Sequence, residues 1–177
     1  MSKENLLYQF GAAYDEDRWF IALKNAIKGT SPKAAAWKPK GITNSIHEIL
    51  NHLLYYNEAY LRRFKGIDYE YEVESNEETF VGEEDWASTV ARFQFVMDEF
   101  RDLITKADDS RFDELSPPRN TASWRTVIGN ICLHNAHHGG QIVMIRKLQG
   151  SWDKTWGETS PRTAEVPVRA CPALRSK

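Results

Sequence analysis

Cysteine is scarce in this chain, with only Cys132 and Cys171 among 177 residues. Two isolated cysteines form neither a disulfide framework nor a Cys-x-x-Cys metal motif. The chain also lacks an apolar run of about 18–20 residues, which a membrane-spanning helix requires. Its first residues lack the apolar stretch of a signal peptide. We therefore expect a cytoplasmic protein with no membrane partner.

An excess of positive charge is missing too. Lysine and arginine together number 23, and aspartate and glutamate number 25, which gives a formal net charge of −2. Proteins that bind nucleic acid present clustered basic side chains to the phosphates, and no face of this sequence is obviously basic. We therefore expect no nucleic-acid partner. With 41% hydrophobic and 27% charged residues, the composition is that of an ordinary globular domain.

Strong β-strand patterns and internal repeats are absent, and helical periodicity takes their place. Apolar residues recur at spacings of three and four in four long segments. The clearest of these stripes contains Trp86, Val90, Phe93, Met97, Phe100 and Ile104. The four predicted helices cover residues 5–28, 45–66, 86–104 and 122–149.

Capping residues mark several ends of these helices. Ser45 and Glu48 form a capping-box pattern, in which each side chain binds a backbone N–H that the helix leaves without a partner. Ser31 followed by Pro32 predicts a short extra helical turn between the first two helices. Gly150 is suited to end the fourth helix.

The whole pattern predicts an all-α fold, a four-helix bundle. Four amphipathic helices of similar length, each with one apolar stripe, bury those stripes against one another. We assign the bundle to residues 1–150. Residues 151–177 contain three prolines and show little periodicity, so we expect an irregular C-terminal tail. Residues 68–85 are acidic and contain no lysine or arginine, which favours a solvated connection over a metal-binding loop.

Two histidines interrupt the apolar stripe of the fourth predicted helix. His134 and His138 occupy positions where the pattern would place isoleucines, and residues four apart share one face of a helix. Buried imidazole nitrogens need partners. The commonest way to satisfy two of them at this spacing is a shared metal ion, which neutral histidine binds.

A metal ion held by two imidazoles is weakly bound, so a third ligand is needed. On the second predicted helix, His52 lies at the edge of the apolar stripe, whereas His47 falls on a more exposed sector. His52 is therefore the better candidate. His137 could also contact His134 across a helical turn, but it lies to one side of the apolar stripe. We therefore interpret it as a residue that flanks the metal site. Hydrogen bonding to backbone or carboxylate partners is the alternative for each single histidine.

Other residues near these histidines are open to more than one interpretation. Gln141 continues the same helix face and could hydrogen-bond a metal-bound water or ligand, or simply the bundle interior. We interpret Gly139 and Gly140 as a point where a neighbouring helix packs closely. Cys132 faces away from the histidines, as a small core or interface residue rather than a nucleophile.

At these residues the chain resembles the DinB-like (YfiT-like) superfamily of metal-binding four-helix bundles. The matching pieces are Ser45-Ile-His-Glu-Ile-Leu-Asn-His52-Leu and His134-x-x-x-His138-x-Gly140-Gln141-Ile142, together with Trp86 after a run of acidic residues. The resemblance covers about residues 5 to 150. It implies a three-histidine metal site at His52, His134 and His138, and a homodimer. Several members of the family are transferases that use low-molecular-weight thiols, and others have no assigned activity.

Three neutral histidines leave positions open on a divalent ion, as in catalytic rather than closed structural sites. Zn, Ni, Fe and Mn are all compatible with imidazole ligands. We expect a metal-dependent transferase that activates a low-molecular-weight thiol for attack on an electrophilic small-molecule substrate. Gln141 and Tyr56 are candidates for contacts with the ligands or the substrate. One alternative is a metal-dependent hydrolase, although no carboxylate base is obvious near the histidines. The others are a non-catalytic metal- or ligand-binding stress-response dimer and a bundle with merely structural histidines.

Overall fold

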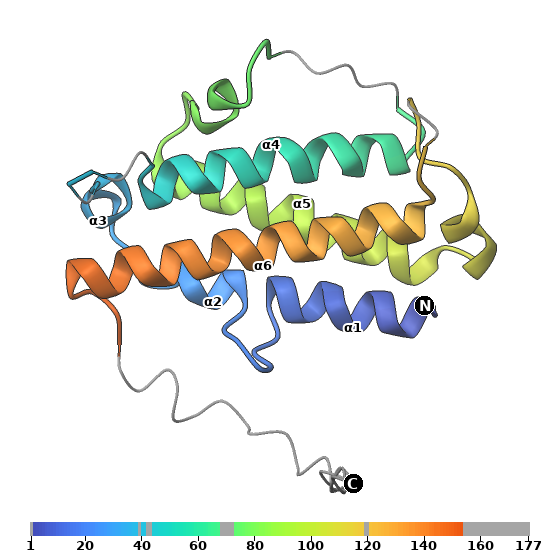
Figure 1. The fold of residues 1–177 in the computed structure, drawn as a ribbon, viewed down its shortest axis with the longest axis horizontal. Helices are drawn as coiled ribbons and strands as arrows, with labels where there is room; N and C mark the ends of the chain where they lie inside the picture. Colours follow the sequence, from blue (N-terminus) through green and yellow to red (C-terminus); the bar gives the residue numbers. More distant parts are fainter. Residues whose placement is uncertain (1, 39, 42–43, 68–72, 119–120, 154–177) are drawn as a thin grey trace, which may run out of the picture.

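The computed structural model describes residues 2–38, 40–41, 44–67, 73–118 and 121–153. Within these residues it is a helical bundle with no β-strand, only an isolated bridge between Leu115 and Ser123. Three long helices run side by side (Figure 1). They are α4 (Ile46–Phe64), α5 (Trp86–Lys106) and α6 (Trp124–Gln149). The shorter elements are α1 (Lys3–Tyr14), α2 (Leu23–Ile27), α3 (Pro32–Ala36) and the 3-10 turns η1 (Glu77–Phe80) and η2 (Asp109–Asp113).

The all-helical bundle is confirmed, but the prediction of one continuous first helix over residues 5–28 is wrong. α1 and α2 lie one after the other along α6, separated by residues 15–22 (Figure 1). The Asp17 carboxylate accepts hydrogen bonds from the backbone N–H of Ala22 at 2.8 Å and from the Asn25 amide at 3.0 Å. Side chains that bind nearby backbone groups in this way compete with helix formation. The two short helices together fill the first position of the bundle.

The predicted capping residues act as expected. Ser45 Oγ accepts from the Glu48 backbone N–H, and the Glu48 carboxylate accepts from the Ser45 N–H at 2.7 Å, which completes the capping box of α4. Ser31 caps α3, with Pro32 in its first turn. Gly150 ends α6 with φ of +72°, a backbone conformation that L side chains rarely adopt.

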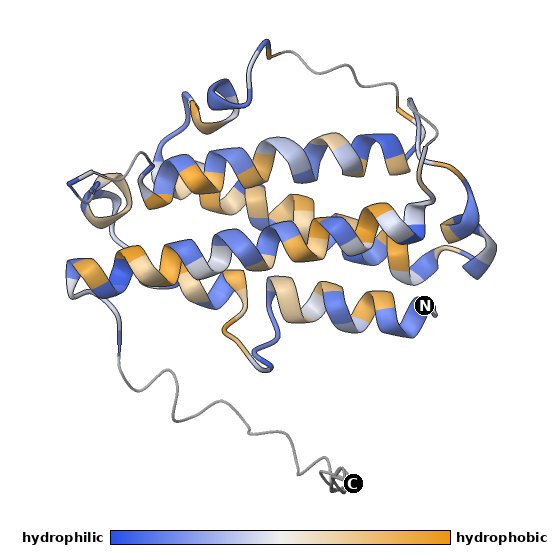
Figure 2. Cartoon of the chain, viewed as in Figure 1, coloured by the Kyte–Doolittle hydropathy of each residue, from blue (hydrophilic) through white to orange (hydrophobic). Residues whose placement is uncertain are grey.

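The core lies where the apolar stripes of the helices meet. Each long helix carries both hydrophobic and hydrophilic residues along its length (Figure 2). Fully buried side chains include Phe93, Phe100, Met97, Trp124, Leu50 and Leu53. In the described part of the chain, no helix combines the length and apolarity that crossing a membrane requires. Of the predicted 151–177 tail, residues 154–177 lie outside the described residues.

Of the two glycines of α6 where close packing was expected, α2 packs at Gly139 but no described residue packs at Gly140. A Cβ atom at Gly139 would lie 3.7 Å from Leu23 Cδ1, an ordinary van der Waals contact. A Cβ atom at Gly140 would meet nothing within 4 Å. The neighbouring helix therefore does not require a glycine at either position.

A buried pair of amides joins α4 to α6 inside the core. Asn57 and Asn135 are 1% and 0% exposed, and each donates a hydrogen bond to the other, at 2.9 and 3.1 Å. Asn57 also donates to the Leu53 carbonyl at 2.7 Å. Because the two amides bond only in matching positions, they fix how α4 and α6 are aligned. The histidines of α4 and α6 depend on that alignment.

We expect Asn135→Ala to lower the free energy of unfolding by about 1–3 kcal/mol, because it leaves the buried Asn57 carbonyl without its partner. Denaturant unfolding followed by circular dichroism would measure the loss. The double variant Asn57→Leu/Asn135→Leu removes both polar groups and should cost less than the sum of the two single leucine substitutions. A loss below about 0.5 kcal/mol in Asn135→Ala would contradict the structural role of the pair.

Candidate metal centre

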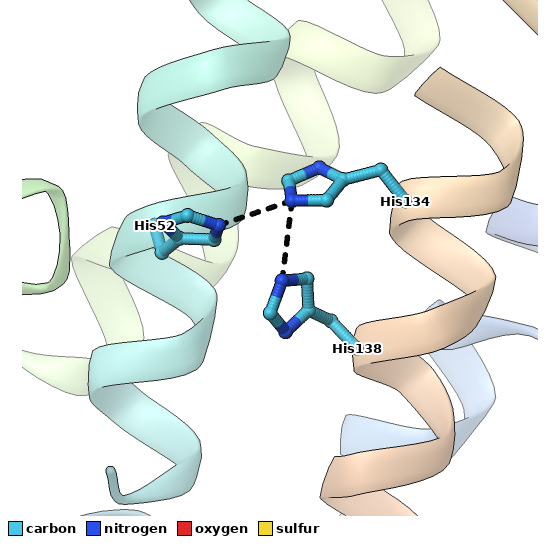
Figure 3. Close-up of side chains that lie close together, drawn as sticks. All are labelled: His52, His134 and His138. Carbon is cyan, nitrogen blue, oxygen red and sulfur yellow. Dashed lines mark hydrogen bonds between the residues drawn. The ribbon is translucent and has the colours of Figure 1, made fainter. Parts of the chain in front are cut away.

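Three histidines from two helices meet in the space between α4 and α6. His52 lies on α4, and His134 and His138 lie one turn apart on α6 (Figure 3). His52 and His138 are 3% and 8% exposed, and His134 is half-buried. His134 Nε2 lies 3.0 Å from His52 Nε2 and 3.1 Å from His138 Nε2. The sequence-predicted trio is therefore brought together, with one ring nitrogen of each residue within 4.8 Å of the others.

The η1 turn fixes which nitrogen of His52 carries its proton. Thr79 Oγ1 donates its single hydrogen to the Asn76 carbonyl at 2.6 Å. The same oxygen lies 2.6 Å from His52 Nδ1, so it must accept a hydrogen bond from that nitrogen. His52 Nδ1 is then the protonated nitrogen, and His52 Nε2 presents a lone pair toward His134.

Gln141 does the same for His138. Its Oε1 lies 2.7 Å from His138 Nδ1 and accepts from it, while its Nε2 donates to His137 Nε2 at 3.1 Å. This amide orientation satisfies both histidines at once, and it leaves the His138 Nε2 lone pair directed at His134. Of the two interpretations of Gln141 from the sequence, contact with a histidine of the cluster is the one that the structure shows.

The donor set fits a divalent metal ion. Two Nε2 lone pairs face the single His134 Nε2 at hydrogen-bond distance, and one proton there cannot satisfy both of them well. Zn–N bonds of about 2.0–2.1 Å in a tetrahedral arrangement place the ligand nitrogens about 3.3 Å apart, close to the two separations observed here. Hydrogen-bond acceptors behind metal-binding histidines are the usual means of orienting them.

Burial keeps these imidazoles neutral. Loss of solvation, together with the neighbouring His138 and His134, lowers the pKa of His52 to about 3. Loss of solvation also lowers the pKa of His134 to about 4. It lowers the pKa of His138 as well, although the hydrogen bond to Gln141 opposes the change. Neutral histidine is the form that binds metal ions, so the protein holds the trio ready for an ion at neutral pH.

A cavity of about 510 Å³ opens beside the three histidines, between α4, α6 and η1. The Phe80 ring stacks on His52, with ring centroids 4.1 Å apart and planes at 12°. The Tyr56 ring meets His52 and His134 edge-on, with centroids 5.0 and 5.6 Å apart, and its hydroxyl donates to Asn76 Oδ1 at 3.1 Å. Tyr56, expected to contact the ligands or substrate, thus lies in the wall of the cavity next to two of the histidines.

The remaining histidines stay outside the trio. His47 is half-buried on another face of α4, where its Nε2 lies 3.0 Å from Thr89 Oγ1. His137 is exposed at the rim of the cavity and bonds Gln141. Cys132 is buried away from the cluster, and burial raises the pKa of its thiol to about 12, so it is not a nucleophile at neutral pH.

The sequence did not reveal the contribution of the acidic connection over residues 68–85. Residues 68–72 lie outside the described residues, but the segment that follows is not merely solvated. Thr79 is 2% exposed and hydrogen-bonds His52, Phe80 stacks on the same ring, and Asn76 accepts from Tyr56. In the sequence of this segment, the only local sign of burial is the pair Thr79–Phe80 among carboxylates. A single pair shows no helical periodicity, so it did not predict a contact with His52.

We expect Thr79→Val to weaken metal binding about 10–100-fold, because valine keeps the shape of threonine but cannot accept the His52 Nδ1 proton. Competition with a chromophoric chelator would measure the affinity. ¹⁵N NMR of the metal-free protein would show whether His52 loses its Nδ1–H form. Thr79→Ser keeps the hydroxyl and is the matched control. Equal affinities for the valine and serine variants would contradict this role of Thr79.

Comparison with known proteins gives one family match. The sequence model of the DinB superfamily matches residues 21–142, more than half of the chain, and this range contains all three clustered histidines. No curated protein and no solved structure matches the chain.

Proposed function

This chain belongs to the DinB superfamily, and we propose that it is a metal-dependent transferase that activates a low-molecular-weight thiol for attack on an electrophile. The observation that carries the proposal is the convergence of three histidine Nε2 atoms at a cavity wall. Such an arrangement holds an ion by three protein ligands and leaves room for a fourth ligand from the cavity. Zn, Ni and Fe suit an all-imidazole donor set, and Mn is compatible with it but binds more weakly.

In this proposal each residue of the site has a distinct task. His52, His134 and His138 hold the ion, while Thr79 and Gln141 keep the His52 and His138 rings in the ligating form. A divalent ion bound there would lower the pKa of a thiol and keep it as thiolate at neutral pH. Phe80 and Tyr56 cover the His52 ring and limit the access of water to it.

The cavity lining favours a thiol over water as the nucleophile. No aspartate or glutamate is found among the described residues that line the cavity. A hydrolase that attacks with water benefits from such a base, whereas a thiolate needs no base once it has formed. The lining therefore supports transfer from a thiol more than hydrolysis.

Turnover with a defined thiol tests the proposal. Protein reconstituted with Zn²⁺ or Ni²⁺ would be mixed with a panel of thiols and a chromogenic alkylating or arylating electrophile, and conjugation would be followed spectroscopically. We expect conjugation that needs thiol, stops with chelator and is lost in His138→Ala. Chelator-sensitive cleavage of ester or amide substrates without thiol would instead favour the hydrolase. Bound metal with no turnover across the panel would favour a non-catalytic binding protein.

We also propose that the protein acts as a cytoplasmic homodimer. Trp19 and Leu133, which are 86% and 70% exposed, line one apolar hollow between α1 and α6. Exposed apolar patches of this kind mark interaction surfaces. Light scattering coupled to size-exclusion chromatography would give the mass, and a monomer at micromolar concentration would contradict the dimer.

A further inference from the structure

The cavity beside the three histidines is elongated along the helix axes. On α4 its lining runs from His52 to Tyr60, eight steps along the chain, or about 12 Å at the rise of an α-helix. On α6 it runs from His138 to Val127, about 16 Å by the same measure. A ligand with one end at the histidines therefore has room to extend about 12 Å toward Tyr60 and Val127.

The described lining residues of this groove carry no formal charge. Apart from the histidines, they are aromatic, aliphatic or amide side chains: Tyr56, Asn57, Tyr60, Asn76, Phe80, Val127, Asn130 and Ile131. The amide of the buried Asn57 is already bonded to Asn135, and the Tyr56 hydroxyl is already bonded to Asn76. What the groove offers a ligand is mostly apolar and aromatic surface with a few neutral polar atoms.

A charged group on the ligand would have no compensating partner along this lining. Burying an ion without a partner costs far more than burying an apolar group. Arg63 lies behind Tyr60, with its guanidinium 5.4 Å from the Tyr60 ring centroid, but it is 5% exposed and does not line the groove. The described lining contains no lysine or arginine, and a metal ion at the three histidines would bring positive charge at one end.

We propose that the ligand of this groove is an elongated, uncharged molecule with one metal-binding group at its end and an apolar or aromatic body about 12 Å long. This inference rests on the proposed function for the metal-bound end. It adds that the body of the ligand, whether thiol or electrophile, carries no carboxylate. Such a lining selects against the carboxylate-bearing thiols that a basic pocket would bind.

Two thiols that differ only in remote charge test the proposal. 6-Mercaptohexanamide and 6-mercaptohexanoate share chain length and thiol basicity, and the ligand-to-metal charge-transfer absorption of Co²⁺-loaded protein would report binding of each. We expect the amide to bind at least tenfold more tightly than the acid. Equal affinities, or tighter binding of the acid, would overturn the proposal.

A charge placed in the groove gives the converse test. Asn130 is exposed at the groove, so Asn130→Lys adds an ammonium group there and should narrow or reverse the preference for the amide. Leu148→Lys adds the same charge near the other end of α6, outside the lining, and should leave the preference unchanged. An unchanged preference in Asn130→Lys would show that the thiols bind elsewhere and would overturn the proposal.

The failure of this inference can be separated from failure of the metal proposal. Methyl NMR of metal-free protein would follow Val127 and Ile131 in the groove during titration with each thiol. If Co²⁺ does not bind, the metal proposal fails, and shifts caused by the amide but not the acid still support an uncharged ligand. Shifts of equal size with both thiols, or with neither, would refute the groove preference with or without metal.

Discussion

His134→Ala is expected to abolish stoichiometric metal binding. His134 Nε2 is the atom that lies 3.0 and 3.1 Å from the other two ligand nitrogens, so its loss leaves two imidazoles on different helices. Removing a residue that merely orients a ligand costs about 10–100-fold in metal affinity, and removing a ligand should cost more. Metal content by elemental mass spectrometry after reconstitution and desalting would measure the effect, with about one ion per chain expected in the unsubstituted protein.

The chain supplies matched controls for this experiment. His137→Ala removes a histidine from the same helix that lines the same cavity but lies outside the trio. His47→Ala removes one from α4 that bonds Thr89 instead. Both variants should keep the ion. Loss of metal in either one, or its retention in His134→Ala, would show that the ligand set is different.

The metal-free protein is expected to lose stability steeply as the pH falls from about 6.5 to 4. The native pKa is about 3 for His52 and about 4 for His134, against an ordinary value of 6.5 in the unfolded chain. In this window the unfolded chain binds protons that the native protein does not, so acid favours unfolding, whereas above pH 6.5 both forms are neutral. Each such histidine contributes a slope of up to about 1.4 kcal/mol per pH unit.

Chemical denaturation at several pH values, with chelator present, would give this slope. His52→Gln removes one of these groups and should flatten the curve. Saturating Zn²⁺ should raise the stability near neutral pH, because the ion binds the native arrangement of three ligands more tightly than the unfolded chain. A stability that does not change between pH 6.5 and 4 in metal-free protein would refute the neutral buried histidines.

Much of the bundle follows from local rules that the sequence displays. The stripe from Trp86 to Ile104 predicts α5, and the Ser45–Glu48 box and Gly150 mark helix ends where the structure has them. The break between α1 and α2 could not be predicted in the same way. It depends on the Asp17 side chain binding the Ala22 backbone N–H and the Asn25 amide, local hydrogen bonds that leave no signature in the apolar periodicity.

The residues of the candidate site also fall into those that local patterns predict and those that they do not. His134 and His138 were predictable because both sit on one helix, where spacing alone determines which residues share a face. His52 followed from its place on the stripe of a second helix. Thr79 and Phe80 were missed because they lie in a four-residue 3-10 turn, and the hydrogen bond from Thr79 to His52 spans 27 positions of the chain.

The uneven division of the three ligands between helices has a consequence for how the protein assembles. α6 alone offers a two-point chelate, since His134 and His138 lie one turn apart on it. Only the docking of α4 adds His52 and completes the set. The metal affinity would therefore depend partly on α6 alone and partly on the contact between α6 and α4. A bound ion would thus report on assembly: a chain in which α6 alone has formed would hold it loosely, and the closed bundle would hold it tightly.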